Sequence, residues 1–249
     1  MNLNGKLAVV TGGASGIGRS ICLRLARDGA DVAVLDLNRA GAQATAHAVE
    51  QGGRRAAAIE VDVSSAINVG EAFAAVRHQL GAVQILVNDA GICEYAAFLP
   101  MHEAVWDRMI AVHVKGAFHC ARAAIPDMQS AGWGRIVNLS SVAGLNGGGP
   151  GLVHYATAKA ALIGFTKSLA REVGPSGITV NAIAPGLIDT PMIRTAKVPE
   201  AIIQQLADDS PVRRIGAPDD IAAACAYLVS QEASFVTGQV ISPNGGSYV

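Results

Sequence analysis

A serine, a tyrosine and a lysine in the second half of the chain are placed to handle the proton of an alcohol. Tyr155 and Lys159 are four residues apart at the start of a helical stretch, so their side chains share one face. A nearby ammonium favours the phenolate, so we expect it to pull the tyrosine pKa from about 10 towards neutrality, making Tyr155 a usable acid or base. Ser140 and Ser141 follow an apolar run, where a hydroxyl could donate a hydrogen bond to a carbonyl oxygen. Taken alone, the Tyr-x-x-x-Lys spacing is common by chance.

A glycine-rich turn near the N-terminus predicts a phosphate site. The segment TGGASGIG, at 11–18, lies between an apolar run and a helical stretch. Glycines at such a turn let the backbone approach a pyrophosphate closely, and the helix N-terminus offers free N–H groups. The spacing differs from the Gly-x-Gly-x-x-Gly of the standard dinucleotide fingerprint, so an ordinary loop is the alternative.

Asp36 ends the second apolar run of the chain, at 32–36, which is the first run after the glycine turn. A carboxylate there can accept hydrogen bonds from the adenosine ribose hydroxyls and would repel a 2′-phosphate. Residues 12–18 contain no Arg or Lys, and Leu37 follows the acid. The pattern favours NAD over NADP, although an ordinary exposed Asp at the end of a strand would look the same.

The hydrophobic pattern places these residues around a parallel sheet. Short apolar runs predict strands at 7–11, 32–36, 57–61, 85–88, 136–139, 178–183 and 239–242. Amphipathic stretches predict helices at 17–28, 39–51, 66–80, 102–130, 154–173 and 218–230. The alternation predicts an α/β fold: a single-domain, Rossmann-type doubly wound parallel sheet of about seven strands with helices on both faces, covering residues 1–249. An irregular stretch around 187–210 is interpreted as a substrate lid.

Composition excludes several classes of protein. The 249 residues are 51% hydrophobic and 16% charged, which excludes a disordered chain. A net charge of −1 argues against nucleic acid or an anionic membrane as a partner. No run is long and apolar enough to span a bilayer, and the N-terminus carries no basic leader. The four cysteines form no Cys-x-x-Cys pair, which suits a cytoplasmic protein, and no metal-ligand spacing indicates a metal site.

Eight short motifs, in order, resemble those of the classical short-chain dehydrogenases/reductases over essentially the whole chain. They are TGGASGIG (11–18), Asp36, Asp62-Val63, NDAG (88–91), the serine pair (140–141), YATAK (155–159), Pro185-Gly186 and TGQVISPNGG (237–246). The resemblance implies that Ser141 polarises the substrate oxygen and that Tyr155 transfers the proton. It also implies that Lys159 holds the nicotinamide ribose and depresses the tyrosine pKa, and that the protein is a homotetramer.

The same resemblance assigns residues to the dinucleotide, which we expect to be NAD. For the turn and the adenosine half they are Gly12, Ser15, Gly16, Ile17, Gly18, Asp36, Leu37, Asp62 and Val63. For the supporting strand and the nicotinamide half they are Asn88, Ala90, Gly91, Tyr155, Lys159, Pro185, Gly186, Ile188 and Thr190.

The chain departs from the family pattern at two positions. Asp89 replaces the second asparagine of an Asn-Asn-Ala-Gly motif, a change expected to affect only a supporting hydrogen bond. His113 stands where family members usually carry an asparagine that helps to hold a proton-relaying water. Histidine also offers one donor and one acceptor and titrates near neutrality, so we expect His113 to keep the relay with an altered pH dependence. A buried helix residue with the relay rerouted, and impaired activity, are the alternatives.

The expected substrate pocket is mostly apolar. Its residues are Ser141, Tyr155, Cys93, Leu145, Leu152, Val153, Leu187, Met192 and Ile193. Such a lining favours an uncharged small molecule. The expected function is therefore NAD-dependent interconversion of a secondary alcohol and a ketone by hydride transfer.

A 3-oxoacyl-thioester reductase, acting on acyl carrier protein or coenzyme A substrates, is the alternative. Many relatives have this activity, commonly prefer NADPH and need basic residues near the mouth of the site. Asp36 weighs against it, whereas Arg194 and Lys197 on the expected lid keep it open. A nucleotide-binding regulator without catalysis is a third possibility, which the intact Ser–Tyr–Lys set disfavours.

Overall fold

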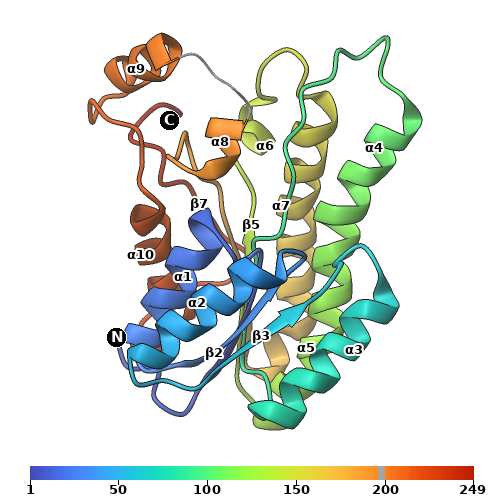
Figure 1. Cartoon of the computed structure of the whole chain (residues 1–249), viewed down its shortest axis with the longest axis vertical. Helices are drawn as coiled ribbons and strands as arrows, with labels where there is room; N and C mark the ends of the chain where they lie inside the picture. The colour runs from blue at the N-terminus through green and yellow to red at the C-terminus, as the bar shows by residue number, and fades with distance from the viewer. Residues whose placement is uncertain (196–199) are drawn as a thin grey trace.

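A parallel sheet forms the centre of the computed structural model, which describes residues 1–195 and 200–249 (Figure 1). Its strands are β1 (Leu7–Thr11), β2 (Asp31–Asp36), β3 (Ala56–Glu60), β4 (Ile85–Asn88), β5 (Gly134–Leu139), β6 (Ile178–Ile183) and β7 (Val240–Ile241). They lie in the order β3-β2-β1-β4-β5-β6-β7, and each neighbouring pair is parallel. The predicted doubly wound parallel sheet is confirmed.

Helices cover both faces of the sheet, and alternate strand residues point to each face. The flanking helices are α1 (Gly16–Arg27), α2 (Arg39–Gln51), α3 (Ala66–Gln79), α5 (Gly116–Ala131), α7 (Val153–Val173), which a 3₁₀ turn (Gly174–Ser176) follows, and α10 (Pro218–Val229). Ala8 and Val10 of β1 pack in the layer with α1, α2 and α10. Leu7 and Val9 pack in the opposite layer with α3, α5 and α7. Because both faces are buried, the strands read as continuous apolar runs. Within the described residues, no helix is long and apolar enough to cross a bilayer.

The stretch predicted as one helix over 102–130 is helical but not uniform. α4 (Glu103–Ile110) passes into a π-helical turn at Ala111–Lys115, and α5 follows directly. A π turn widens the helix by one residue and occurs frequently at functional sites. The turn contains His113, the residue that departs from the family pattern.

The segment 187–210 was expected to be irregular, and this expectation is wrong for its described part, which contains two helices. α8 (Pro191–Thr195) and α9 (Glu200–Asp209) lie above the carboxyl edge of the sheet (Figure 1). In α9, Ile203 and Ala207 are four residues apart and are less exposed than the other described side chains of the helix. This spacing is helical, but the prolines in the segment led to the expectation of an irregular stretch. Lys197 lies outside the described residues.

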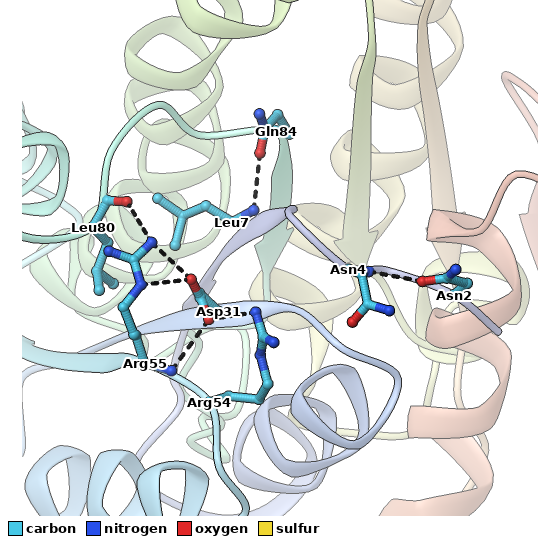
Figure 2. A network of polar contacts seen from close by, with 8 residues as sticks. All are labelled: Asn2, Asn4, Leu7, Asp31, Arg54, Arg55, Leu80 and Gln84. Carbon is cyan, nitrogen blue, oxygen red and sulfur yellow. Dashed lines mark hydrogen bonds and ion pairs between the residues drawn. The ribbon is translucent and has the colours of Figure 1, made fainter.

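An ion-pair network closes the opposite edge of the sheet (Figure 2). The Asp31 carboxylate, at the start of β2, accepts hydrogen bonds from the side chains of Arg54 (2.7 Å) and Arg55 (2.8 Å) and from the Arg55 backbone N–H (3.1 Å). Arg55 also donates to the Leu80 carbonyl oxygen (3.1 Å). The network ties β2 to the loop before β3, far from the carboxyl ends of the strands.

Candidate active site

A cavity of about 540 Å³ lies at the carboxyl ends of the central strands. Loops after β1, β4, β5 and β6 form its walls, with the short helices α6 (Ala143–Asn146) and α8. Ligands of open parallel sheets bind at this edge where the strand order reverses, here between β1 and β4. The predicted residues that line the cavity are Gly12, Ser15, Gly16, Ile17, Asp36, Gly91, Cys93, His113, Ser141, Leu152, Tyr155, Lys159, Pro185, Gly186, Leu187, Ile188, Thr190, Met192 and Ile193.

Other predicted residues stand behind or beside the cavity rather than in its lining. They are Gly18, Leu37, Asp62, Val63, Asn88, Ala90, Leu145 and Val153. Asn88 donates a 2.8 Å hydrogen bond to Asn138 Oδ1, which ties β4 to β5. Asp62 accepts hydrogen bonds from the backbone (2.9 Å) and hydroxyl (2.6 Å) of Ser64 and shapes the loop after β3. These contacts support the walls from outside.

The glycine turn after β1 is packed too tightly for larger residues. Gly12 has a φ of +71°, and a Cβ there would lie 2.9 Å from the Ala90 backbone nitrogen. A Cβ on Gly18 would lie 2.7 Å from Asp89 Oδ2. α1 begins at Gly16, so its first N–H groups face the same end of the sheet. The turn and helix N-terminus form a cradle of the kind that accepts phosphates.

Asp36, at the end of β2, lies beside this cradle. Its carboxylate accepts hydrogen bonds from the backbone N–H groups of Ala14 (3.0 Å) and Asn38 (2.8 Å). These bonds fix the acid beside the glycine turn while it still lines the cavity. Among the described lining residues, Lys159 is the only lysine or arginine, so no guanidinium faces a 2′-phosphate there.

The structure separates the roles of the two serines after β5. The Ser141 hydroxyl accepts a 3.1 Å bond from the Ala143 N–H and lies close enough to the Tyr155 hydroxyl to lower the pKa of that group. The Ser140 hydroxyl instead donates a 2.8 Å bond to the Lys159 backbone oxygen and holds α7 against the sheet. Ser141 is therefore the serine that can share a ligand oxygen with the tyrosine.

The pKa of Tyr155 differs from the sequence-based expectation. Burial raises it above its usual value of about 10, and the hydrogen bond from Ser141 opposes the rise. The Lys159 ammonium lies 5.6 Å from the centre of the tyrosine ring and donates a 2.7 Å bond to the Leu139 carbonyl oxygen. Burial lowers the lysine pKa to about 8, opposed by the nearby Asp89. Tyr155 is therefore a protonated phenol at neutral pH, and its pKa is raised where the spacing to Lys159 predicted that it would be lowered.

His113 is held as a neutral imidazole, so its expected titration near neutrality is wrong. Burial and the Lys159 charge lower its pKa to about 3. Nε2 lies 2.8 Å from the Ile92 carbonyl oxygen and 3.1 Å from the Ile92 backbone nitrogen, and the shorter contact favours the tautomer with its proton on Nε2. Nδ1 is then an acceptor, and it is buried without a partner among the described residues. The ring presents this free acceptor beside Tyr155, from which its centroid is 5.7 Å distant.

Sequence reasoning missed several residues of the lining. Those not assigned to the site are Asp89, Leu139, Ser140, Val142, Ala143, Asn146, Gly148 and Pro191, whereas Tyr95, which like Cys93 follows the NDAG motif, was a candidate for the pocket. Asp89 is the one with a charge, and its departure from the family motif was the available signal. The others lie at the end of β5, in the short helices α6 and α8, or in the loops beside them, and a sequence pattern does not give the course of such segments.

Comparisons with known proteins agree along nearly the whole chain. A family model described as enoyl-(acyl carrier protein) reductase matches residues 12–247. Nodulation protein G of Azospirillum brasilense is 43% identical over 97% of both chains. The 3-oxoacyl-(acyl-carrier-protein) reductase of Aquifex aeolicus is 39% identical over 100% of this chain and 99% of its own. Among solved structures, a protein described as a short-chain alcohol dehydrogenase from Sinorhizobium meliloti has a TM-score of 0.94 and 38% identity, covering 99% of this chain and 97% of its own. A short-chain type dehydrogenase/reductase from Mycobacterium marinum has a TM-score of 0.93 and 31% identity, covering 99% and 96%.

Proposed function

Because the chain belongs to the classical short-chain dehydrogenases/reductases, we propose that it is an NAD(H)-dependent reductase of the ketone in a 3-oxoacyl thioester. The observation that carries the proposal is that Ser141 and Tyr155 both line the cavity, with the Ser141 hydroxyl near enough to act on the Tyr155 hydroxyl. Two hydroxyl groups that meet there can hold one carbonyl oxygen between them. The product of the proposed reaction is the corresponding secondary alcohol.

The cradle fits a nicotinamide dinucleotide. A pyrophosphate needs close backbone approach and free N–H groups, which Gly12 and the N-terminus of α1 provide. Asp36 is placed to accept from ribose hydroxyls and to repel a 2′-phosphate, which favours NAD(H) over NADP(H). When bound, the nicotinamide supplies the hydride for reduction.

The chain's own residues handle the proton. Tyr155 is protonated at neutral pH because burial raises its pKa, and reduction requires an acid in this state. Ser141 donates a hydrogen bond to the carbonyl oxygen as negative charge develops on it. Lys159 holds a positive charge beside the tyrosine and lowers the cost of the phenolate left after proton transfer. The neutral His113 offers Nδ1 as a hydrogen-bond acceptor beside this pair, which can orient the donor group that returns a proton to Tyr155.

Two observations support the thioester as substrate. Proteins named for the reduction of 3-oxoacyl carrier-protein substrates are 39–42% identical to this chain over nearly its full length. The part of the cavity lining formed by Leu152, Leu187 and Met192 is apolar and suits an acyl chain.

A free ketone or secondary alcohol is the second candidate. The apolar wall suits such a molecule equally well, and Arg194 of α8 is engaged with Asp189 (2.9 Å) rather than free for an acidic carrier. The similar protein from Sinorhizobium meliloti is described as an alcohol dehydrogenase.

Initial rates on matched substrates test the proposal. We would compare acetoacetyl coenzyme A and a 3-oxoacyl carrier protein with uncharged cyclic and aryl ketones, each with NADH and with NADPH. The proposal predicts the highest kcat/KM for a thioester with NADH. A preference for free ketones would establish the second candidate, and a preference for NADPH would overturn the role given to Asp36.

We also propose that the protein is a homotetramer, with α4, α5, α7 and β7 at its interfaces. Phe118 on α5 supports this, because 46% of so large an apolar side chain is exposed in the single chain. Light scattering should give about four times the chain mass of 25.4 kDa. The monomer mass would contradict the proposal.

A further inference from the structure

Asp89, the residue after β4, lies between the phosphate cradle and the catalytic lysine. Its backbone N–H donates a 3.1 Å bond to the Thr11 hydroxyl, which fixes it beside the glycine turn. Its carboxylate lies against Gly18 in the first turn of α1, so close that a Cβ on Gly18 would lie 2.7 Å from Oδ2, and the Gly18 N–H lowers the pKa of the carboxyl. The carboxylate also lines the cavity.

This carboxylate occupies the position of an anion at a helix N-terminus. The first turn of α1 contains no acidic residue, and in the described structure the Ser15 side chain makes no capping bond. Asp89 therefore supplies from β4 the negative charge that the helix dipole favours. A pyrophosphate in the cradle would be a second anion at the same helix end, and like charges in a buried site repel strongly.

The groups facing Asp89 come from four other elements. They are Lys159 and Tyr155 of α7, Asp36 of β2, Cys22 of α1 and Cys225 of α10. Lys159 is the single cation that the carboxylate faces among these, and Asp36 is a second acid. Burial raises the pKa of Asp89 to about 7, although Lys159 and the Gly18 N–H oppose the rise. Its charge can therefore change within the ordinary working range of pH.

We propose that Asp89 takes up a proton from solvent when the dinucleotide binds, so that this one carboxyl makes cofactor affinity fall as pH rises. The inference rests on the dinucleotide site of the proposed function. The protonated carboxyl no longer opposes the phosphates, and its hydroxyl can donate a hydrogen bond. Above the pKa of free Asp89, binding must include protonation, so affinity weakens with each further rise in pH.

Calorimetry of NADH binding tests this without turnover. Binding heats in buffers of different ionisation enthalpy give the number of protons taken up. We expect uptake of a substantial fraction of a proton near pH 7.5, and a Kd that rises about tenfold from about pH 6 to about pH 8.5. Binding without uptake would overturn the inference and leave the proposed function intact, whereas no binding of NADH or NADPH would overturn both.

Lys159 could also take up a proton, because its pKa is lowered to about 8. The Lys159→Arg variant removes this source, since a guanidinium stays charged throughout the range. Proton uptake should persist in Lys159→Arg and vanish in Lys159→Arg/Asp89→Asn. Loss in the single variant would assign the uptake to Lys159 and overturn the inference. Asp28→Asn, at the other end of α1, is the matched control and should leave the uptake unchanged.

A measurement on the unaltered chain covers the case that these variants do not fold. Carbon NMR of chain labelled at aspartate carboxyls should show one resonance titrating near pH 7 in the free protein. It should move to the protonated position on NADH binding at that pH, and it is identified in the unaltered chain as the aspartate carboxyl whose pKa is raised to about 7. A resonance that stays ionised in the complex would contradict the proposal.

Discussion

The imidazole of His113 meets the phenol ring of Tyr155 edge-on, with the ring centroids 5.7 Å apart. The π turn at Ala111–Lys115 places the imidazole there, and the hydrogen bond to the Ile92 carbonyl fixes its orientation. The ring is buried and neutral, so its contribution is one hydrogen-bond acceptor rather than a titrating charge. A proton relay past Tyr155 could use His113 in two ways, as a hydrogen-bond acceptor or as a protonated histidine. The neutral ring fits the first of these.

Replacement of His113 distinguishes these two relays. His113→Phe removes the acceptor and should lower kcat by about 10–100-fold, less than most direct proton-transfer effects because His113 acts through Tyr155. His113→Asn restores an acceptor and should recover most of the activity. Because the pKa of His113 is lowered to about 3, the pH–rate profiles of wild type and His113→Asn should have the same shape above about pH 5. A break near pH 6.5 that only wild type shows would contradict this account.

Gly91 leaves the room that His113 needs. A Cβ at this position would lie 2.4 Å from His113 Cε1, so Gly91→Ala must displace the ring or the loop after β4. We expect kcat to fall at least as far as in His113→Phe, with a smaller change in NADH affinity. Gly70→Ala is the matched control, because a Cβ there meets nothing within 4 Å. Unchanged kcat in Gly91→Ala would show that the position of the ring is unimportant.

Asp36 should set the preference between the two dinucleotides. Asp36→Asn keeps an acceptor for the backbone N–H groups of Ala14 or Asn38 but removes the charge that repels a 2′-phosphate. The ratio of kcat/KM for NADPH to that for NADH should rise by about tenfold or more, because like-charge repulsion is lost. Steady-state kinetics with both cofactors measures this ratio. An unchanged ratio would place the discrimination elsewhere.

The Asp31 network should stabilise the fold without affecting the reaction (Figure 2). Burial alone would raise the pKa of Asp31, but its bonds to Arg55 and the Arg54 charge outweigh burial and lower it. Asp31→Asn should reduce the free energy of unfolding by about 1–3 kcal/mol near pH 7, with kcat unchanged.

The stabilisation by Asp31 should also depend on pH in one direction. A carboxyl with a lowered pKa contributes fully above its unfolded value, near pH 4, and the contribution is lost as pH falls through the folded value. Denaturant unfolding at several pH values should therefore show the two proteins converging in acid. A stability difference that grows on acidification would contradict the sign.

The sheet, the cradle and the Ser–Tyr–Lys set could be predicted because each leaves a local pattern. Buried parallel strands appear as apolar runs, and a close backbone approach requires glycine at Gly12. A four-residue spacing places Tyr155 and Lys159 on one face of α7. Strand boundaries differed by no more than two residues from those expected, for example at β3 and β7.

Other features depend on packing between distant segments. The π turn around His113 adds a single residue inside a long helical pattern, which hydrophobic periodicity does not register. The protonation states of Tyr155 and His113 follow from burial under loops, so expectations from Lys159 alone pointed the wrong way. Asp89 acquires its neighbours only when β4, α1 and α7 meet.

The rate of NADH oxidation with acetoacetyl coenzyme A, measured for wild type and Tyr155→Phe, tests the central claim most directly. The phenol is the only proton donor assigned to the substrate oxygen, so its loss should reduce kcat/KM by about 10²–10⁴-fold. NADH binding by calorimetry should be retained, and Tyr95→Phe, a tyrosine at the cavity with 58% exposure, should keep its activity. Equal rates for wild type and Tyr155→Phe would contradict the account.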